Sequence, residues 1–67
     1  MKFEQFGINL AKERQNKNIS AYELSLRLGK DKSYINKVEN AKINISLKMM
    51  IAIADLLNIS ISNLVKD

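Results

Sequence analysis

The amino-acid sequence predicts an all-α fold, a compact bundle of five short helices. Apolar side chains recur at helical spacing along the chain, and the connections between these stripes are short. The tripeptide Asn-Ile-Ser occurs three times and has the signature of a helix start each time. A chain of 67 residues is too short to bury a large core, so a small helical bundle is the economical solution. We expect residues 1–67 to form a single domain.

The first helix is expected over roughly residues 3–17, because Phe6 and Leu10 lie on one stripe of it. The second helix begins at Ser20, whose hydroxyl can accept a hydrogen bond from a free backbone N–H group. It ends at Gly29, because glycine adopts the left-handed backbone conformation without a steric penalty.

A tight turn is predicted between the second and third helices. Glu23, three residues after Ser20, completes a capping box at the start of the second helix. Leu24 and Leu28 are one turn apart and form the buried side of that helix. Asp31 provides the N-cap of the third helix, which leaves a turn of about three residues, as a helix-turn-helix requires.

The third helix is predicted to have one apolar and one polar face. Because successive residues turn by about 100° around the axis, Tyr34, Ile35 and Val38 fall on the inward side. The outward side carries Lys32, Ser33, Asn36, Lys37 and Asn40. These side chains suit phosphate groups and base edges in the major groove of DNA. An ordinary solvated helix surface is the alternative interpretation.

The three copies of Asn-Ile-Ser are expected to mark three helix starts. They begin at Asn18, Asn44 and Asn58. In each copy the serine is the expected N-cap, and the isoleucine before it is expected to pack on an apolar residue of the first turn. These apolar partners are Leu24, Met50 and Leu64. Asn18 and Asn58 are also expected to end the preceding helices in a left-handed conformation.

The fourth and fifth helices are expected to serve as scaffold. The fourth is lined by Leu47, Met50, Ile53, Ala54 and Leu57, and the fifth spans residues 61–66. The core is expected to contain Leu24, Leu28, Ile35, Val38, Met50, Ile53 and Leu57. Three isoleucines have no obvious place in a monomer core: Ile43, Ile45 and Ile61. They are either contacts with a two-fold partner or helix-start and scattered surface residues.

The net charge of +4 is concentrated in one segment, residues 27–48. This segment holds six basic residues, Arg27, Lys30, Lys32, Lys37, Lys42 and Lys48, and two acidic residues, Asp31 and Glu39. The remainder of the chain is balanced. Such a concentration favours a polyanionic partner. A membrane surface is less favoured, because few large apolar side chains of the segment are free to insert.

Composition excludes several classes of function. The chain contains no cysteine and no histidine, which excludes disulfides, ordinary structural zinc sites and catalysis by histidine. No nucleophile, base or metal cluster is visible, so we expect no enzymatic activity, no cofactor and no small-molecule substrate. The sequence shows neither a signal peptide nor a long apolar run. We therefore expect a cytoplasmic protein that does not contact a membrane.

From Phe6 to Val65 the sequence resembles the Cro and phage-repressor helix-turn-helix family, also called the xenobiotic-response-element type. The resemblance rests on Arg14, Ser20, Glu23, Leu24, Leu28, Gly29, residues 33–40, Ser46, Leu47, Ile53, Ala54 and Leu57. It implies a bundle of four or five helices that binds operator DNA, usually as a symmetric dimer, with the third helix in the major groove. The expected function is therefore a sequence-specific transcriptional regulator, with repression as the expected mode.

The resemblance also implies roles for individual residues. The positions that meet base edges are Lys32, Ser33, Asn36 and Lys37. The positions that touch the sugar-phosphate backbone are Ala21, Tyr34, Asn40, Lys42 and Asn44. Arg14 and Glu39 are implied to form a structural ion pair between the first and third helices.

Four positions depart from the family pattern. Ala21 stands where glutamine usually braces a phosphate, and Lys30 stands where an apolar residue is usual. Ala41 replaces a common glycine after the third helix, and Ile45 replaces a frequent proline before the fourth. The missing glutamine favours an alternative function, a helical protein-interaction module such as an antitoxin or adaptor. The concentrated basic charge opposes that alternative.

Overall fold

A computed structural model describes residues 2–67, so only Met1 of the predicted domain lies outside it. The described part of the chain forms five helices and no strand, which confirms the predicted all-α fold. The helices are α1 (Phe3–Asn16), α2 (Ala21–Arg27), α3 (Tyr34–Glu39), α4 (Leu47–Leu57) and α5 (Ser62–Val65).

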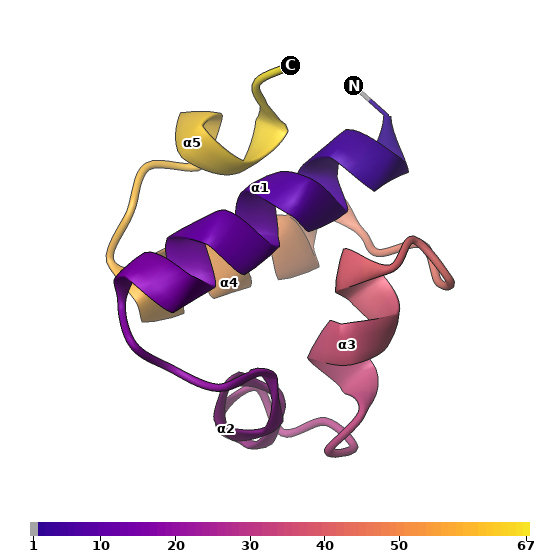
Figure 1. Cartoon of the computed structure of the whole chain (residues 1–67), viewed down its shortest axis with the longest axis vertical. Helices are drawn as coiled ribbons and strands as arrows, with labels where there is room; N and C mark the ends of the chain where they lie inside the picture. Colours follow the sequence, from indigo (N-terminus) through magenta and orange to yellow (C-terminus); the bar gives the residue numbers. More distant parts are fainter. Residues whose placement is uncertain (1) are drawn as a thin grey trace.

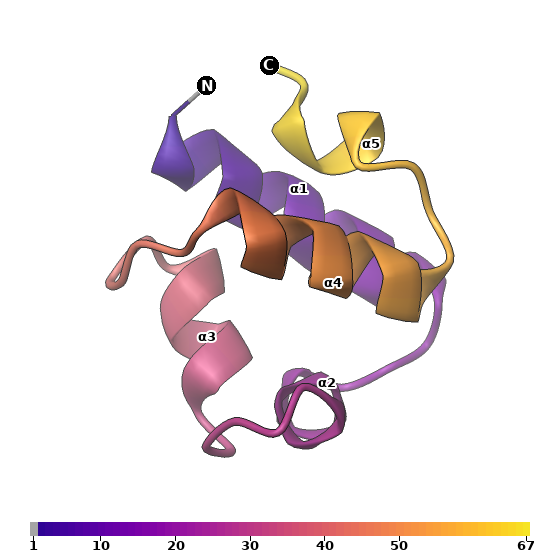
Figure 2. The same ribbon diagram turned by 180° about the vertical axis from the view of Figure 1, so that it is seen from behind.

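The two longest helices, α1 and α4, cross the middle of the molecule one behind the other (Figures 1 and 2). Helix α5 lies along one side of this pair, and α2 and α3 lie together on the opposite side. Asn9, a buried residue of α1, donates hydrogen bonds from Nδ2 to the carbonyls of Leu64 (3.0 Å) and Lys66 (2.6 Å). The end of α5 is therefore fastened to α1 by a polar contact that the sequence analysis missed.

The core joins side chains from all five helices. Its members are Phe6, Leu10, Leu24, Ile35, Val38, Met50, Ile53, Ala54, Leu57 and Leu64. Six of the seven predicted core residues are among them. Leu28 is the exception, because it is only partly buried and packs against the edge of the cluster.

Two of the three predicted serine N-caps are confirmed. The hydroxyl of Ser20 accepts from the N–H of Glu23 (3.0 Å), and that of Ser46 accepts from the N–H of Met49 (3.1 Å). The predicted capping box is incomplete, because the Glu23 carboxylate forms an ion pair with Arg27. Helix α5 begins at Ser62 and not directly after Ser60, whose hydroxyl accepts from the Ser62 N–H (3.3 Å).

The isoleucines without an expected place in the core lie at its edge. Ile43, Ile45 and Ile61 are each partly buried and pack against the core cluster. The helix-start alternative therefore describes Ile45, and all three isoleucines lie beside the monomer core. The chain leaves each helix close to the core, so an isoleucine in a connection still covers its edge.

Helices α1 to α4 end in the same backbone motif, with a left-handed residue just after the helix. These residues are Asn18, Gly29, Ala41 and Asn58, with φ of 56°, 72°, 56° and 56°. In each case the following N–H reaches back to a carbonyl in the last turn, as from Ile19 to Arg14 (3.3 Å). The predictions for Asn18, Gly29 and Asn58 are confirmed, whereas Ala41 takes the conformation without the freedom of glycine.

Within residues 2–67, no helix has both the length and the apolar character needed to cross a membrane.

Candidate nucleic-acid interface

The connection between α2 and α3 is longer than predicted and spans residues 28–33. Asp31 does not cap α3. Its carboxylate accepts from the backbone N–H (3.1 Å) and the hydroxyl of Ser33, and its carbonyl accepts from the N–H of Tyr34 (2.9 Å). Asp31 thus closes a separate turn ahead of the helix, and the predictions of a short turn and of an Asp31 N-cap are wrong.

Ser25 fixes α3 against α2 through a buried hydroxyl. Its Oγ accepts a hydrogen bond from the N–H of Ile35 (2.9 Å) and donates one to the carbonyl of Ala21 (2.7 Å). The Ile35 N–H lies in the first turn of α3, where no carbonyl of the same helix can reach it. Ser25 is not among the functional residues expected from the sequence, because the pattern along α2 does not show that the N–H of Ile35 lies beside it.

An ion pair between Arg14 and Glu39 holds the other end of α3 against α1. The Nε and Nη2 groups of Arg14 donate to the two carboxylate oxygens at 2.7 and 3.1 Å. Its Nη1 donates to the carbonyl of Ile19 (2.9 Å). The hydrogen bonds to Glu39 raise the pKa of Arg14 above its ordinary value, so the guanidinium stays charged. The pair implied by the family resemblance is present in the structure.

Gly7 allows α1 and α3 to touch through their backbones. A Cβ atom at this position would lie 2.3 Å from the carbonyl oxygen of Glu39, far closer than any van der Waals contact. The neighbouring atom belongs to the backbone, so it cannot move aside alone. Gly7 and Arg14 are two turns apart on α1, and both hold the last residue of α3. Gly7 is not among the functional residues expected from the sequence.

These contacts leave one side of the α3 region facing outward, and we call Lys32, Ser33, Asn36 and Lys37 the α3 face. The side chains of Lys32, Asn36 and Lys37 are exposed, and that of Ser33 is partly exposed. Ile35 and Val38 are buried on the opposite side, as predicted. Asn40 is exposed and donates from Nδ2 to the backbone carbonyl of Asn36 (2.8 Å). The same Nδ2 lies 3.4 Å from the side-chain oxygen of Asn36.

The other positions assigned to the sugar-phosphate backbone lie on α3, in its connection to α4 and at the start of α2. Lys42 and Asn44 are exposed in the connection from α3 to α4, while Ala21 is partly buried at the start of α2. Tyr34 is partly buried, which raises the pKa of its hydroxyl. The ammonium of Lys30 lies 5.5 Å from the centre of the Tyr34 ring, close enough for a cation–π contact.

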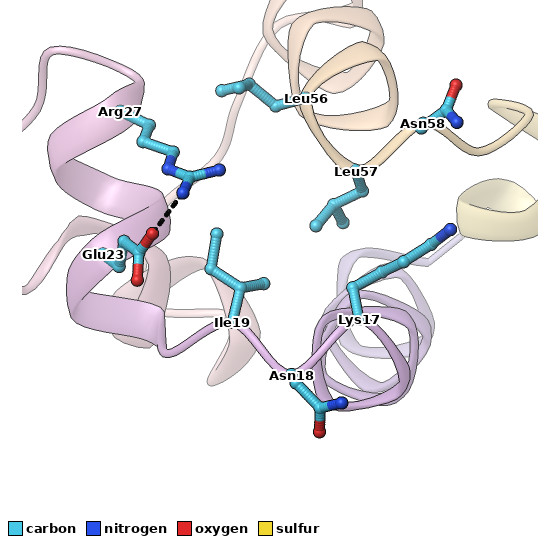
Figure 3. Close-up of a pocket in the computed structure, with 8 residues that line it drawn as sticks. All are labelled: Lys17, Asn18, Ile19, Glu23, Arg27, Leu56, Leu57 and Asn58. Carbon is cyan, nitrogen blue, oxygen red and sulfur yellow. Dashed lines mark hydrogen bonds and ion pairs between the residues drawn. The ribbon is translucent and has the colours of Figure 1, made fainter.

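The basic residues of the charged segment do not all lie together. Lys30, Lys32, Lys37 and Lys42 are exposed on α3 and its two connections. Arg27 instead forms an ion pair with Glu23 at the rim of a pocket of about 270 Å³ (Figure 3). This pocket lies between the ends of α1 and α4 and the outer side of α2. It contains no residue of α3 and is separate from the α3 face.

The profile of a protein family described as helix-turn-helix matches residues 10–64 of the chain. The chain belongs to the Cro and phage-repressor-like helix-turn-helix family. The resemblance derived from the motifs is thereby confirmed. The family is one of DNA-binding transcription regulators and not of enzymes. Comparison with curated proteins and with solved structures gives no significant match.

Proposed function

We propose that this helix-turn-helix protein is a transcriptional repressor that acts by occupying a specific DNA site, with α3 in the major groove. The observation that carries the proposal is the α3 face, an exposed set of lysine and small polar side chains on a firmly held helix. A helix fixed at both ends can present its side chains to base edges with little further ordering. The exposed lysines around it supply the positive field that DNA binding needs.

The proposed contacts divide into two groups. Lys32, Ser33, Asn36 and Lys37 would meet base edges, because they point outward from the α3 region. The sugar-phosphate backbone would be met by Tyr34, Asn40, Lys42 and Asn44, which lie on and beside it. Ala21 has no polar side chain, so this position would contribute least to affinity.

We also propose that the DNA-bound form is a homodimer, with half-sites about one helical turn apart. Because Ile43, Ile45 and Ile61 already pack on the core, they offer little apolar surface to a partner. The exposed side chains of Leu47 and Ile51, one turn apart on α4, offer more. Analytical ultracentrifugation with and without DNA tests this proposal, and a monomer at all concentrations in both conditions would contradict it.

The alternative, a protein-interaction module, is favoured by one observation. Tyr22 and Leu26 are one turn apart on α2 and are 56% and 50% exposed. A partner protein that covers them would bind mainly through apolar contact and would respond little to salt. DNA binding through lysines responds strongly to salt, because each neutralised phosphate releases counterions.

A salt titration therefore separates the two functions. The logarithm of DNA affinity should fall against the logarithm of salt concentration by about 0.9 per neutralised phosphate. The Lys42→Ala variant should reduce this slope by about 1 and weaken binding to all sequences equally. Lys37→Ala should weaken binding to the selected site by about 1–3 kcal/mol more than to random DNA. Failure to bind any DNA at low salt would overturn the proposed function.

A further inference from the structure

Asp31 is an acidic residue within the most basic part of the molecule, and it is bonded to one residue of the α3 face. Its carboxylate accepts two hydrogen bonds from Ser33, one from the backbone N–H (3.1 Å) and one from the hydroxyl. These bonds lower the pKa of Asp31. The carboxylate is therefore ionised at neutral pH and can only accept hydrogen bonds.

The bond to Asp31 determines what the Ser33 hydroxyl can still do. A serine hydroxyl has one hydrogen to donate and two lone pairs that accept. A bond to an ionised carboxylate is among the stronger hydrogen bonds in proteins, so the single hydrogen is committed to Asp31. Toward a ligand on its outward side, Ser33 then offers only lone pairs.

Base edges in the major groove divide into donors and acceptors. The donors are the exocyclic amines, N6 of adenine and N4 of cytosine, and the acceptors are N7, O6 and O4. We infer that Ser33 accepts a hydrogen bond from the exocyclic amine of adenine or cytosine, and that Asp31 imposes this polarity on it. The inference rests on the proposed function and adds a positioning residue, Asp31, which determines specificity through its neighbour.

Without Asp31, Ser33 would be free to bind either kind of base edge. Its hydroxyl could donate to N7 of either purine, to O6 of guanine or to O4 of thymine as readily as it accepts from an amine. The Asp31 carboxylate takes the hydroxyl hydrogen, so Ser33 cannot donate to a base. The lone pairs of the hydroxyl stay free to accept.

The test begins with a binding selection that yields the preferred DNA site. Comparison of wild-type protein with Ser33→Ala on variants of this site then identifies the base pair at which the variant no longer discriminates between bases. At this pair, an analogue without the exocyclic amine replaces the contacted base: purine for adenine, or pyrimidin-2-one for cytosine. Wild-type protein should lose roughly three- to tenfold in affinity, and Ser33→Ala should lose nothing further. A 7-deaza analogue of the purine in the same pair removes an acceptor and should leave wild-type affinity unchanged.

The Asp31→Ala variant tests the source of this polarity. Its affinity should become sensitive to the 7-deaza analogue, because the Ser33 hydroxyl is then free to donate. Asp31→Asn retains an oxygen acceptor for Ser33 and should keep the dependence on the amine. Asp55→Ala removes an exposed carboxylate from α4 and controls for the change in net charge. Thermal unfolding of each variant verifies that the fold is retained.

The possible failures are distinguishable. If the selection yields no specific site, both the proposed function and this inference are overturned. If a site is found but wild-type protein depends on N7 and not on the amine, only the inference is overturned. The same holds if Asp31→Asn changes the preferred base while Ser33→Ala has no effect, because Asp31 would then contact the base itself.

Discussion

Removal of the Ser25 hydroxyl should destabilise the fold measurably. Ser25 is fully buried, and in Ser25→Ala the N–H of Ile35 would lose its partner in a place that water does not reach. An unsatisfied buried donor costs about 1–3 kcal/mol. The higher helix propensity of alanine recovers about 0.5 kcal/mol in α2. The free energy of unfolding should therefore fall by about 1–2 kcal/mol.

The measurement is urea and thermal unfolding followed by circular dichroism. For a domain of this size each kcal/mol corresponds to roughly 4–8 °C, so the Tm should fall by about 5–15 °C. Ser62→Ala is the matched control, because this serine is exposed at the start of α5 and its loss should change stability by less than about 0.5 kcal/mol. If Ser25→Ala were as stable as this control, the claim that Ser25 fastens α3 to α2 would be refuted.

Three further predictions concern backbone geometry and pH. Ala41→Gly should raise the free energy of unfolding by about 0.5–1 kcal/mol, because Ala41 has a φ of 56°; a loss of stability in urea titrations would contradict the strain. Gly7→Ala should lower the free energy of unfolding by about 3 kcal/mol, because the new Cβ would lie 2.3 Å from the carbonyl oxygen of Glu39. Gly29→Ala is the control, because it adds the same methyl group in open space at a φ of 72° and should cost only about 1 kcal/mol. Equal losses of stability in the two variants would refute a clash between residue 7 and Glu39. Burial raises the pKa of Tyr34 above its ordinary value of 10.0, so its contribution to stability is complete below pH 10.0 and is lost as the pH rises through the folded-state pKa. Tyr34→Phe should lack this alkaline loss in denaturant titrations, and an identical pH profile for both proteins would contradict it.

Helices that begin or end on a local signal could be predicted from the sequence. The Ser20 and Ser46 caps and the left-handed Asn18 and Asn58 each depend on a few adjacent residues, and the structure has all four. The start of α3 could not be located in this way. Asp31 has the chemistry of an N-cap, but it bonds to Ser33 and closes a turn of its own.

The contacts that hold α3 in place depend on which helices meet, and a pattern along one helix does not show this. Gly7 has no local role in α1, and its importance appears only where the backbone of Glu39 approaches it. Ser25 likewise looks like a polar interruption of an apolar stripe until the N–H of Ile35 lies beside it. The Arg14 and Glu39 pair was foreseeable only from the family resemblance, since 25 positions separate its members.

The residue that follows each left-handed helix end differs between the two halves of the molecule. It is an isoleucine after α1 and α4, Ile19 and Ile59, and both are partly buried. It is a lysine after α2 and α3, Lys30 and Lys42, and both are exposed. Both ends of the segment from Lys30 to Lys42 are therefore at the surface. Such a stretch is suited to transplantation: a protein engineer could exchange its outward residues for those of another regulator while keeping Ile35, Val38 and Glu39 as the attachment points.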